Sequence, residues 1–144
     1  MDDLEQIRQL KYRYLRTLDT KQWDDFEACF VPEATADYAG LSFEDRAALV
    51  DYMRTNLPRE IVTMHQVHHP EIGIDGDMAT GRWYLYDQVL SAEFGFRLEG
   101  AAFYDDVYRR TPDGWRVSHT GYTRTFEATW DLKDLPGFKL SLPD

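Results

Sequence analysis

Apolar residues recur every three or four positions at the start of the chain, at Leu4, Ile7, Leu10, Tyr14 and Leu18. This spacing is the period of one face of an α-helix. The pattern therefore predicts a helix over residues 3–18 that packs its apolar face against the rest of the fold.

Two further helices are expected before residue 60. The same apolar spacing returns within "TKQWDDFEACF", which predicts a short helix that ends at Pro32. The segment "EATADYAG" then indicates a short strand. Ser42, with Asp45 three residues later, resembles a capping box, and it predicts a third helix over residues 43–56.

The rest of the chain alternates apolar and polar residues, as β-strands do. The expected strands cover residues 61–69, 72–74, 79–89, about 97–110 and 115–126, with turn signals in "DGD" and "TPDGW". Helices followed by antiparallel strands predict an α+β domain, a cone in which a curved sheet wraps around N-terminal helices and encloses a pocket. We expect one such domain over residues 1–144, with an irregular tail from residue 130.

Composition narrows the class of partner. The formal charge of −10 repels phosphate backbones and anionic lipid. Apolar residues make up 43% of the chain, and its 9 Tyr, 8 Phe and 4 Trp can line a cavity as well as fill a core. We therefore expect a small hydrophobic molecule as the partner, and neither nucleic acid nor a membrane.

The first residues, "MDDLEQIRQL", are acidic and amphipathic and lack the features of a signal peptide. No later stretch is apolar enough to span a bilayer. These observations predict a cytoplasmic protein. Apolar side chains near Phe94, Phe96 and Phe103 are expected on the outer face of the sheet, which predicts a homo-oligomer, either a trimer or a dimer.

Three of the four histidines stand in "TMHQVHHPEI". On a strand, His65 and His69 would share a face about 13 Å apart, while His68 would point to the other face. No single metal ion fits that arrangement. The chain also has no HExxH, CxxC, P-loop, GxGxxG or GxSxG motif, and its lone Cys29 is expected to be a small buried residue. We expect neither a metal nor a cofactor.

Asp87 interrupts the apolar face that Trp83, Leu85 and Val89 form on one strand. A buried carboxylate is costly unless it is paired, and a histidine on the neighbouring strand is the natural partner. We expect Asp87 to face His65 and to fix its tautomer, which leaves the outer ring nitrogen free to take a proton. In the alternative, Asp87 lies in water beyond the sheet edge and His65 is an ordinary core histidine.

The order of elements resembles the NTF2-like cone fold. Three segments are similar to its SnoaL-like branch: "YRYLRTLDTKQWDDFEACF", "MHQVHHPEIGIDGDMATGRWYLYDQ" and "GWRVSHTGYTR". The likeness covers about residues 4–124, and the branch includes scytalone dehydratase and the bile-acid 7α-dehydratases. The fold also hosts isomerases, cyclases, dioxygenase small subunits and binding proteins, so the fold alone does not fix the function.

The resemblance implies site residues position by position. These dehydratases use a Tyr and an Asp at the end of the first helix, matched by Tyr14 and Asp19, and a His on the first long strand, matched by His65. The bile-acid enzymes add an acidic residue on the next strand and an Arg on the last, matched by Asp87 and Arg124. Asp19 has a second interpretation, as the N-cap of the following helix.

Other positions are candidates for substrate contact. Scytalone dehydratase uses a Tyr on the early short strand, where Tyr38 stands. Its second catalytic His and its Asn have no counterpart, since Asp87 and about Tyr108 occupy their places. The candidate substrate-binding residues are Tyr38, Trp83, Tyr108 and His119.

The resulting hypothesis is a cofactor-independent dehydratase that acts on a hydrophobic cyclic hydroxy-carbonyl compound of steroid or polyketide type. His65, oriented by Asp87, would remove the proton α to the carbonyl. Tyr14, with Tyr38, would donate a hydrogen bond to the carbonyl oxygen.

Asp19 and Arg124 would act on the rest of the substrate, Asp19 at the departing hydroxyl and Arg124 at a polar end. Two alternatives stay open. One is an isomerase or cyclase that shares the proton abstraction, and the other is a non-catalytic binding protein.

Overall fold

The computed structural model describes residues 1–143. The helices in this part of the chain are α1 (Asp3–Asp19), α2 (Trp23–Glu27), α3 (Arg46–Asn56) and the 3₁₀ helix η1 (Leu132–Asp134). The strands are β1 (Phe30–Tyr38), β2 (Leu41–Phe43), β3 (Val62–Asp75), β4 (Met78–Ser91), β5 (Phe96–Thr111) and β6 (Gly114–Asp131).

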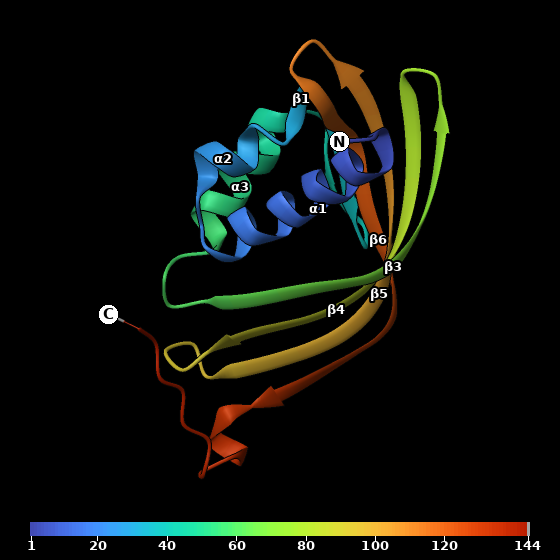
Figure 1. The fold of residues 1–144 in the computed structure, drawn as a ribbon. Helices are drawn as coiled ribbons and strands as arrows, with labels where there is room; N and C mark the ends of the chain where they lie inside the picture. Colours follow the sequence, from blue (N-terminus) through green and yellow to red (C-terminus); the bar gives the residue numbers. More distant parts are fainter. Residues whose placement is uncertain (144) are drawn as a thin grey trace.

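These strands form one sheet in the order β2-β1-β6-β5-β4-β3. Strands β1 and β6 run parallel, and the other neighbours are antiparallel. The long strands curve, and α1, α2 and α3 lie within the curve of the sheet (Figure 1). The prediction of an α+β cone with a curved sheet around N-terminal helices is therefore confirmed.

Strand β3 runs through Pro70, although the sequence predicts two separate strands on either side of it. Because β3 lies at the edge of the sheet, a proline there removes no hydrogen bond from an inner ladder. The irregularity is local. The register shifts between His68 and Glu71, and His69 adopts a φ of 29°.

Helix α3 begins later than expected. Its N-cap is Asp45, whose carboxylate accepts a hydrogen bond from the backbone N–H of Ala48 at 2.8 Å. The capping box predicted at Ser42 is therefore wrong, because Ser42 lies in β2, a short strand that the sequence does not indicate. Strand β6 also extends past its predicted end to Asp131, so the irregular tail starts only after η1.

Helix α1 lies against the sheet through the face predicted from its spacing. The side chain of Asp2 starts the helix by accepting from the backbone N–H of Glu5 at 2.8 Å. Ile7, Leu10 and Tyr14 are at most 1% exposed. Burying this face removes apolar surface from water and fixes where the end of α1 meets the sheet.

A buried ion pair lies beneath α1. Lys11 Nζ is 2.8 Å from Asp106 Oδ2 of β5, and neither side chain is exposed. Asp106 also accepts from the hydroxyls of Tyr108 and Thr120, each at 2.7 Å, and Tyr108 Oη accepts from Trp83 Nε1 at 2.9 Å. This network ties α1 to three central strands, and it satisfies the buried carboxylate.

No helix within residues 1–143 is long and apolar enough to cross a membrane. Phe94 lies in the turn between β4 and β5 and is exposed, whereas Phe96 and Phe103 are only partly exposed. Phe103 packs against the exposed Tyr84, with their ring centroids 4.2 Å apart. A homo-oligomer that covers such side chains stays a prediction.

Candidate functional site

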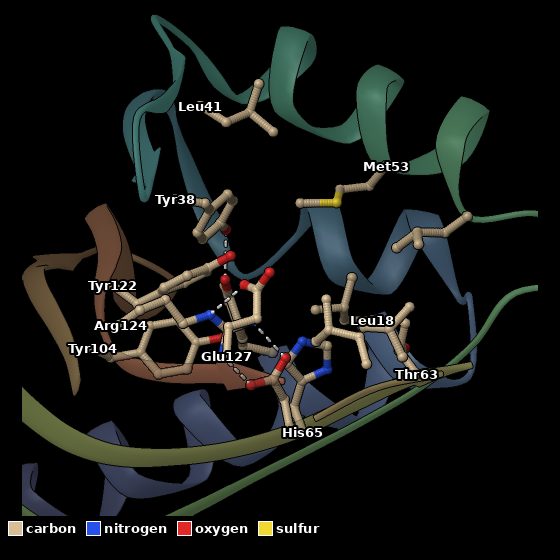
Figure 2. Close-up of a pocket in the computed structure, with 15 residues that line it drawn as sticks. Leu18, Tyr38, Leu41, Met53, Thr63, His65, Tyr104, Tyr122, Arg124 and Glu127 are labelled. Carbon is tan, nitrogen blue, oxygen red and sulfur yellow. Dashed lines mark hydrogen bonds and ion pairs between the residues drawn. The ribbon is translucent and has the colours of Figure 1, made fainter. Parts of the chain in front are cut away.

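A cavity of about 230 Å³ lies between the concave face of the sheet and the helices. Its aliphatic lining consists of Leu18, Leu41, Met53, Leu57, Val89 and Leu98. Its polar and aromatic lining consists of Tyr14, Tyr38, Thr63, His65, Asp87, Tyr104, Tyr122, Arg124 and Glu127. Figure 2 shows these side chains converging on one space from α1, α3 and the strands. Apolar walls with a few convergent polar groups are typical of small-molecule sites.

His65 of β3 is held by Asp19, the last residue of α1. Asp19 Oδ1 lies 2.7 Å from His65 Nδ1, and its Oδ2 accepts from the backbone N–H of His65 at 2.8 Å. The hydroxyl of Thr63 donates to Asp19 Oδ1 at 2.8 Å. Because a carboxylate can only accept, Nδ1 carries a proton, and in the neutral imidazole Nε2 is therefore the nitrogen with the lone pair.

The position of Asp19 has an electrostatic reason. A negative charge at the C-terminal end of a helix is disfavoured by the helix dipole. The three donors from Thr63 and His65 compensate for this, since each of them points a hydrogen at the carboxylate. Asp19 is not the N-cap of α2, because that place is taken by Gln22, which makes no side-chain capping bond.

Two phenols face the cavity from α1 and β1. The hydroxyls of Tyr14 and Tyr38 are 2.6 Å apart, and both side chains are buried. Burial raises the pKa of each phenol well above its ordinary value, so both hydroxyls keep their protons at neutral pH. One hydroxyl donates to the other, and the accepting hydroxyl retains a proton that it can donate to a ligand.

Two more tyrosines complete this aromatic wall. The ring of Tyr104 meets Tyr14 edge-on with centroids 6.0 Å apart, and the ring of Tyr122 stacks on Tyr38 with centroids 5.4 Å apart. The ammonium of Lys11 lies behind this wall, 3.5 Å from the Tyr104 ring centroid and 4.1 Å from that of Tyr14. These contacts fix the rings, so the hydroxyls of Tyr14 and Tyr38 are held in place before a ligand binds.

Arg124 of β6 is paired with carboxylates. Its Nη1 and Nη2 donate to the two oxygens of Asp87 at 2.5 Å and 3.0 Å, and its Nε lies 3.2 Å from Glu127 Oε2. Burial alone would lower the pKa of Arg124, but the hydrogen bonds and charge of Asp87 raise it, so the guanidinium stays charged. Asp87, only 3% exposed, is thereby neutralised inside the fold.

The sequence predictions can now be placed. Tyr14, Tyr38, His65, Asp87 and Arg124 line the same cavity, and Asp19 holds His65 at its edge.

The prediction that Asp87 faces His65 is confirmed, because the two residues are Cα partners on adjacent strands. The prediction that Asp87 fixes the tautomer of His65 is wrong, because Asp19 reaches the imidazole from α1 and Arg124 pairs with Asp87 from β6. Asp19 bonds to His65 and Thr63 and is not among the residues that line the cavity, so its expected role at the departing hydroxyl stays a prediction.

Three predicted substrate contacts lie elsewhere. Trp83 and Tyr108 point to the concave side, but they belong to the buried network of Asp106 and do not line the cavity. His119 is on the other side of the sheet, where its Nδ1 lies 2.7 Å from the hydroxyl of Thr35.

The cavity also contains polar residues that the sequence analysis does not single out: Thr63, Tyr104, Tyr122 and Glu127. Thr63 carries a signal that could have been used, because it stands two residues before His65 and therefore on the same face of the strand. The face of the sheet on which Tyr122 lies depends on register shifts that insert extra residues into β6, and the sequence does not reveal these shifts. Within residues 1–143, no group of three or more His, Cys, Asp or Glu side chains is arranged to hold a metal ion.

Comparison with known proteins gives a family. The model of the SnoaL-like domain matches residues 1–121. An uncharacterized protein of Mycobacterium tuberculosis is 30% identical over 132 residues, which cover 88% of this chain and 88% of that protein.

Solved structures share the fold at lower identity. A protein of Novosphingobium aromaticivorans, provisionally named as an aromatic ring hydroxylase, superposes with a TM-score of 0.81 at 22% identity, covering 92% of this chain and 95% of that one. A protein of the same organism, provisionally named as a scytalone dehydratase, gives 0.80 at 15% identity, covering 87% and 85%. A type 2 hexachlorocyclohexane dehydrochlorinase gives 0.79 at 16% identity, covering 95% and 91%. The family match establishes that the chain belongs to the SnoaL-like family, and the solved structures show that it has the NTF2-like fold.

Proposed function

We propose that this protein is a cofactor-independent lyase that eliminates water from a hydrophobic ring compound with a hydroxyl β to a carbonyl. One observation carries the proposal. The imidazole of His65 is held at Nδ1 by Asp19, so its basic Nε2 is available to the same cavity that the Tyr14–Tyr38 hydroxyl pair faces. A base and an oxyanion donor in one apolar space are what proton abstraction next to a carbonyl requires.

In the proposed reaction, His65 Nε2 takes the proton on the carbon α to the carbonyl. Asp19 orients the ring, selects its tautomer and stabilises the imidazolium that forms, as a carboxylate does for the histidine of a catalytic triad. A positioned general base of this kind contributes about 10²–10⁴ in rate.

Negative charge develops on the carbonyl oxygen during this step. The Tyr14–Tyr38 pair can donate a hydrogen bond to that oxygen, because burial keeps both phenols protonated. A preorganised donor of this type contributes about 10²–10³ in kcat.

The elimination is completed when the C–O bond of the β-hydroxyl breaks. The electron pair of the enolate forms the new C=C bond, the carbonyl is restored, and the hydroxyl leaves as water with the proton carried by His65. The reaction needs no redox partner. Because Asp19 lies at Nδ1 and away from the cavity lining, the imidazolium itself is the proposed acid for the leaving hydroxyl.

Two fold relatives are named for eliminations, one of water and one of hydrogen chloride. At 15% and 16% identity they indicate only that this fold accommodates such chemistry. The proposal therefore depends on the side chains of this chain and needs a direct assay.

The test uses 3-hydroxy-1-tetralone, whose loss of one water followed by tautomerisation gives fluorescent 1-naphthol. The wild-type protein should accelerate this conversion, and His65→Gln should lower kcat by at least about 10²-fold. His119→Gln is the matched control, since it removes a histidine on the other side of the sheet and should leave kcat within about twofold.

A product formed without loss of water would point to an isomerase. Binding of the compound without turnover, in a protein whose fold is intact, would favour a binding protein and contradict the proposal.

A further inference from the structure

We propose that Asp87 sets the charge selectivity of the cavity: by occupying the guanidinium of Arg124, it restricts the site to uncharged ligands. The size of the cavity restricts these ligands further, to one or two rings. The proposal names the substrate class of the function proposed above and rests on that function only for the identity of the site. The binding preference itself can be measured without any turnover.

An arginine in an apolar pocket usually suggests a carboxylate or phosphate ligand, because its planar donors match those groups. In this cavity the donors of Arg124 are already occupied by carboxylates of the protein. Both oxygens of Asp87 accept from Nη1 and Nη2 of Arg124, and Glu127 lies 3.2 Å from Nε. The pair is well shielded, since the side chains of Asp87 and Arg124 are 4% and 17% exposed.

The other charged residues that line the cavity are carboxylates. Asp87 and Glu127 both contact Arg124, which is the only arginine or lysine among the residues that line the cavity. A ligand carboxylate would add a third negative group without a free cation in the lining to receive it. Like charges in a poorly solvated site repel strongly, so an anionic ligand is disfavoured relative to its uncharged analogue.

The backbone is shaped to allow this ion pair. Gly100 of β5 is the register partner of Asp87, and the guanidinium of Arg124 lies directly over it. A Cβ at position 100 would overlap Nη1 of Arg124. Any side chain there must therefore displace the guanidinium that donates to Asp87, so a substitution at Gly100 perturbs the same ion pair independently.

The volume of the cavity limits the size of the ligand. Its volume of about 230 Å³ is below the range of about 300–1,000 Å³ common for ligand pockets. The aliphatic side chains of Leu18, Val89 and Leu98 line it beside the four tyrosines. These dimensions and contacts fit one or two fused rings better than the four-ring steroid nucleus that the sequence left open.

The test compares two bicyclic probes of similar size, 2-naphthol, which is uncharged at neutral pH, and 2-naphthoate, which is ionised. Dissociation constants are measured at pH 7 by calorimetry or probe fluorescence. The wild-type protein should bind 2-naphthol at least about tenfold more tightly than 2-naphthoate. Asp87→Asn, which preserves the shape of the side chain but frees Arg124, should move this ratio at least about tenfold toward 2-naphthoate.

Two further variants complete the test, one as an independent perturbation of the ion pair and one as a control. Gly100→Ala should shift the ratio in the same direction through displacement of Arg124, and it is informative even if Asp87→Asn does not fold. Asp105→Asn is the matched control, because it makes the same change in an exposed pair with Arg82 that does not line the cavity, so its shift should be under about threefold.

The inference is overturned if 2-naphthol does not bind, if the wild-type protein binds both probes equally, or if neither Asp87→Asn nor Gly100→Ala changes the ratio. A failure of the proposed function is seen separately. In that case the tetralone assay shows no turnover, while the preference for the uncharged probe and its dependence on Asp87 persist.

Discussion

Replacing Asp19 by Asn tests how the site prepares its base. The carboxylate accepts three hydrogen bonds, from Nδ1–H and the backbone N–H of His65 and from the hydroxyl of Thr63. An asparagine can place its single oxygen toward the backbone N–H, but its NH₂ group then faces Nδ1. Two donors cannot face each other, so the imidazole proton should move from Nδ1 to Nε2.

The expected magnitudes follow from these contacts. The hydrogen bonds lost involve a charged acceptor that is 20% exposed, which gives a loss of folding free energy of about 2 kcal/mol. Activity should fall much further, because Nε2–H has no lone pair to accept the substrate proton. An Asp-to-Asn change that imposes the wrong histidine tautomer costs about 10⁴ in kcat in a serine protease, equivalent to about 5 kcal/mol of barrier.

The assay needs no substrate. Long-range ¹H–¹⁵N correlation spectra of histidine-labelled protein distinguish a protonated from an unprotonated ring nitrogen. The wild-type protein should show His65 protonated at Nδ1, and the Asp19→Asn variant should show it protonated at Nε2. Asp25→Asn removes the same charge from an exposed position in α2 and should leave the spectrum of His65 unchanged. The reasoning is refuted if the wild-type protein and Asp19→Asn share one tautomer.

Three further predictions concern stability and reactivity. Lys11→Met should lower the free energy of unfolding in urea by about 3–5 kcal/mol, because it leaves Asp106 buried without its cation, and adding Asp106→Leu should restore much of the loss. Burial raises the pKa of Cys29 to about 11, so its alkylation at pH 8 should be slow in the folded protein and become fast in urea, and equal rates would contradict its burial. Hydrogen bonds from Arg110 lower the pKa of Asp3 to about 2, so this carboxylate stabilises the fold at pH values above its ordinary pKa and loses that contribution as the pH falls toward 2. Asp3→Asn should therefore flatten the fall in melting temperature between the ordinary pKa of an aspartate and pH 2. An unchanged slope in this variant would contradict the assignment.

Much of the fold could be predicted because the relevant signals are local. The apolar spacing of α1 and the alternation in β4 reflect which side chains are buried, and that burial is visible in the sequence. Pro70 misled the strand prediction, because its cost depends on whether the strand lies at the edge of the sheet, and strand order is a property of the whole fold.

The candidate site shows the same difference between local signals, which the sequence carries, and contacts that depend on the whole fold. The sequence singles out Asp87 because it interrupts an apolar face, and its adjacency to His65 follows from the pairing of two neighbouring strands. The hydrogen-bond partners of Asp87 and His65 could not be predicted from such local patterns. Asp19 reaches His65 through the packing of α1 on the sheet, and Arg124 reaches Asp87 from β6, across β5 and over Gly100. Such contacts between distant segments depend on packing angles and register, which local patterns do not encode.

The side of the sheet on which a residue lies and its position along the strand are two different properties, and both decide whether it reaches the cavity. Trp83 and Asp87 point to the same side of β4, but four residues of extended chain span about 13 Å. The Trp83 end of that face is filled by the ion pair of Lys11 and Asp106, whereas the Asp87 end borders the cavity. Alternation predicts the face correctly, and only the structure shows which end of the face is empty.

The central claim is that Nε2 of His65 is a base directed at a ligand held by the Tyr14–Tyr38 pair. The most direct measurement is deuterium exchange of the C2 protons of 1-tetralone in D₂O, followed by NMR, with the wild-type protein and with His65→Gln. The account predicts exchange that the wild-type protein accelerates and that His65→Gln abolishes while 1-tetralone still binds. Equal exchange rates in the two proteins, with binding intact in both, would contradict it.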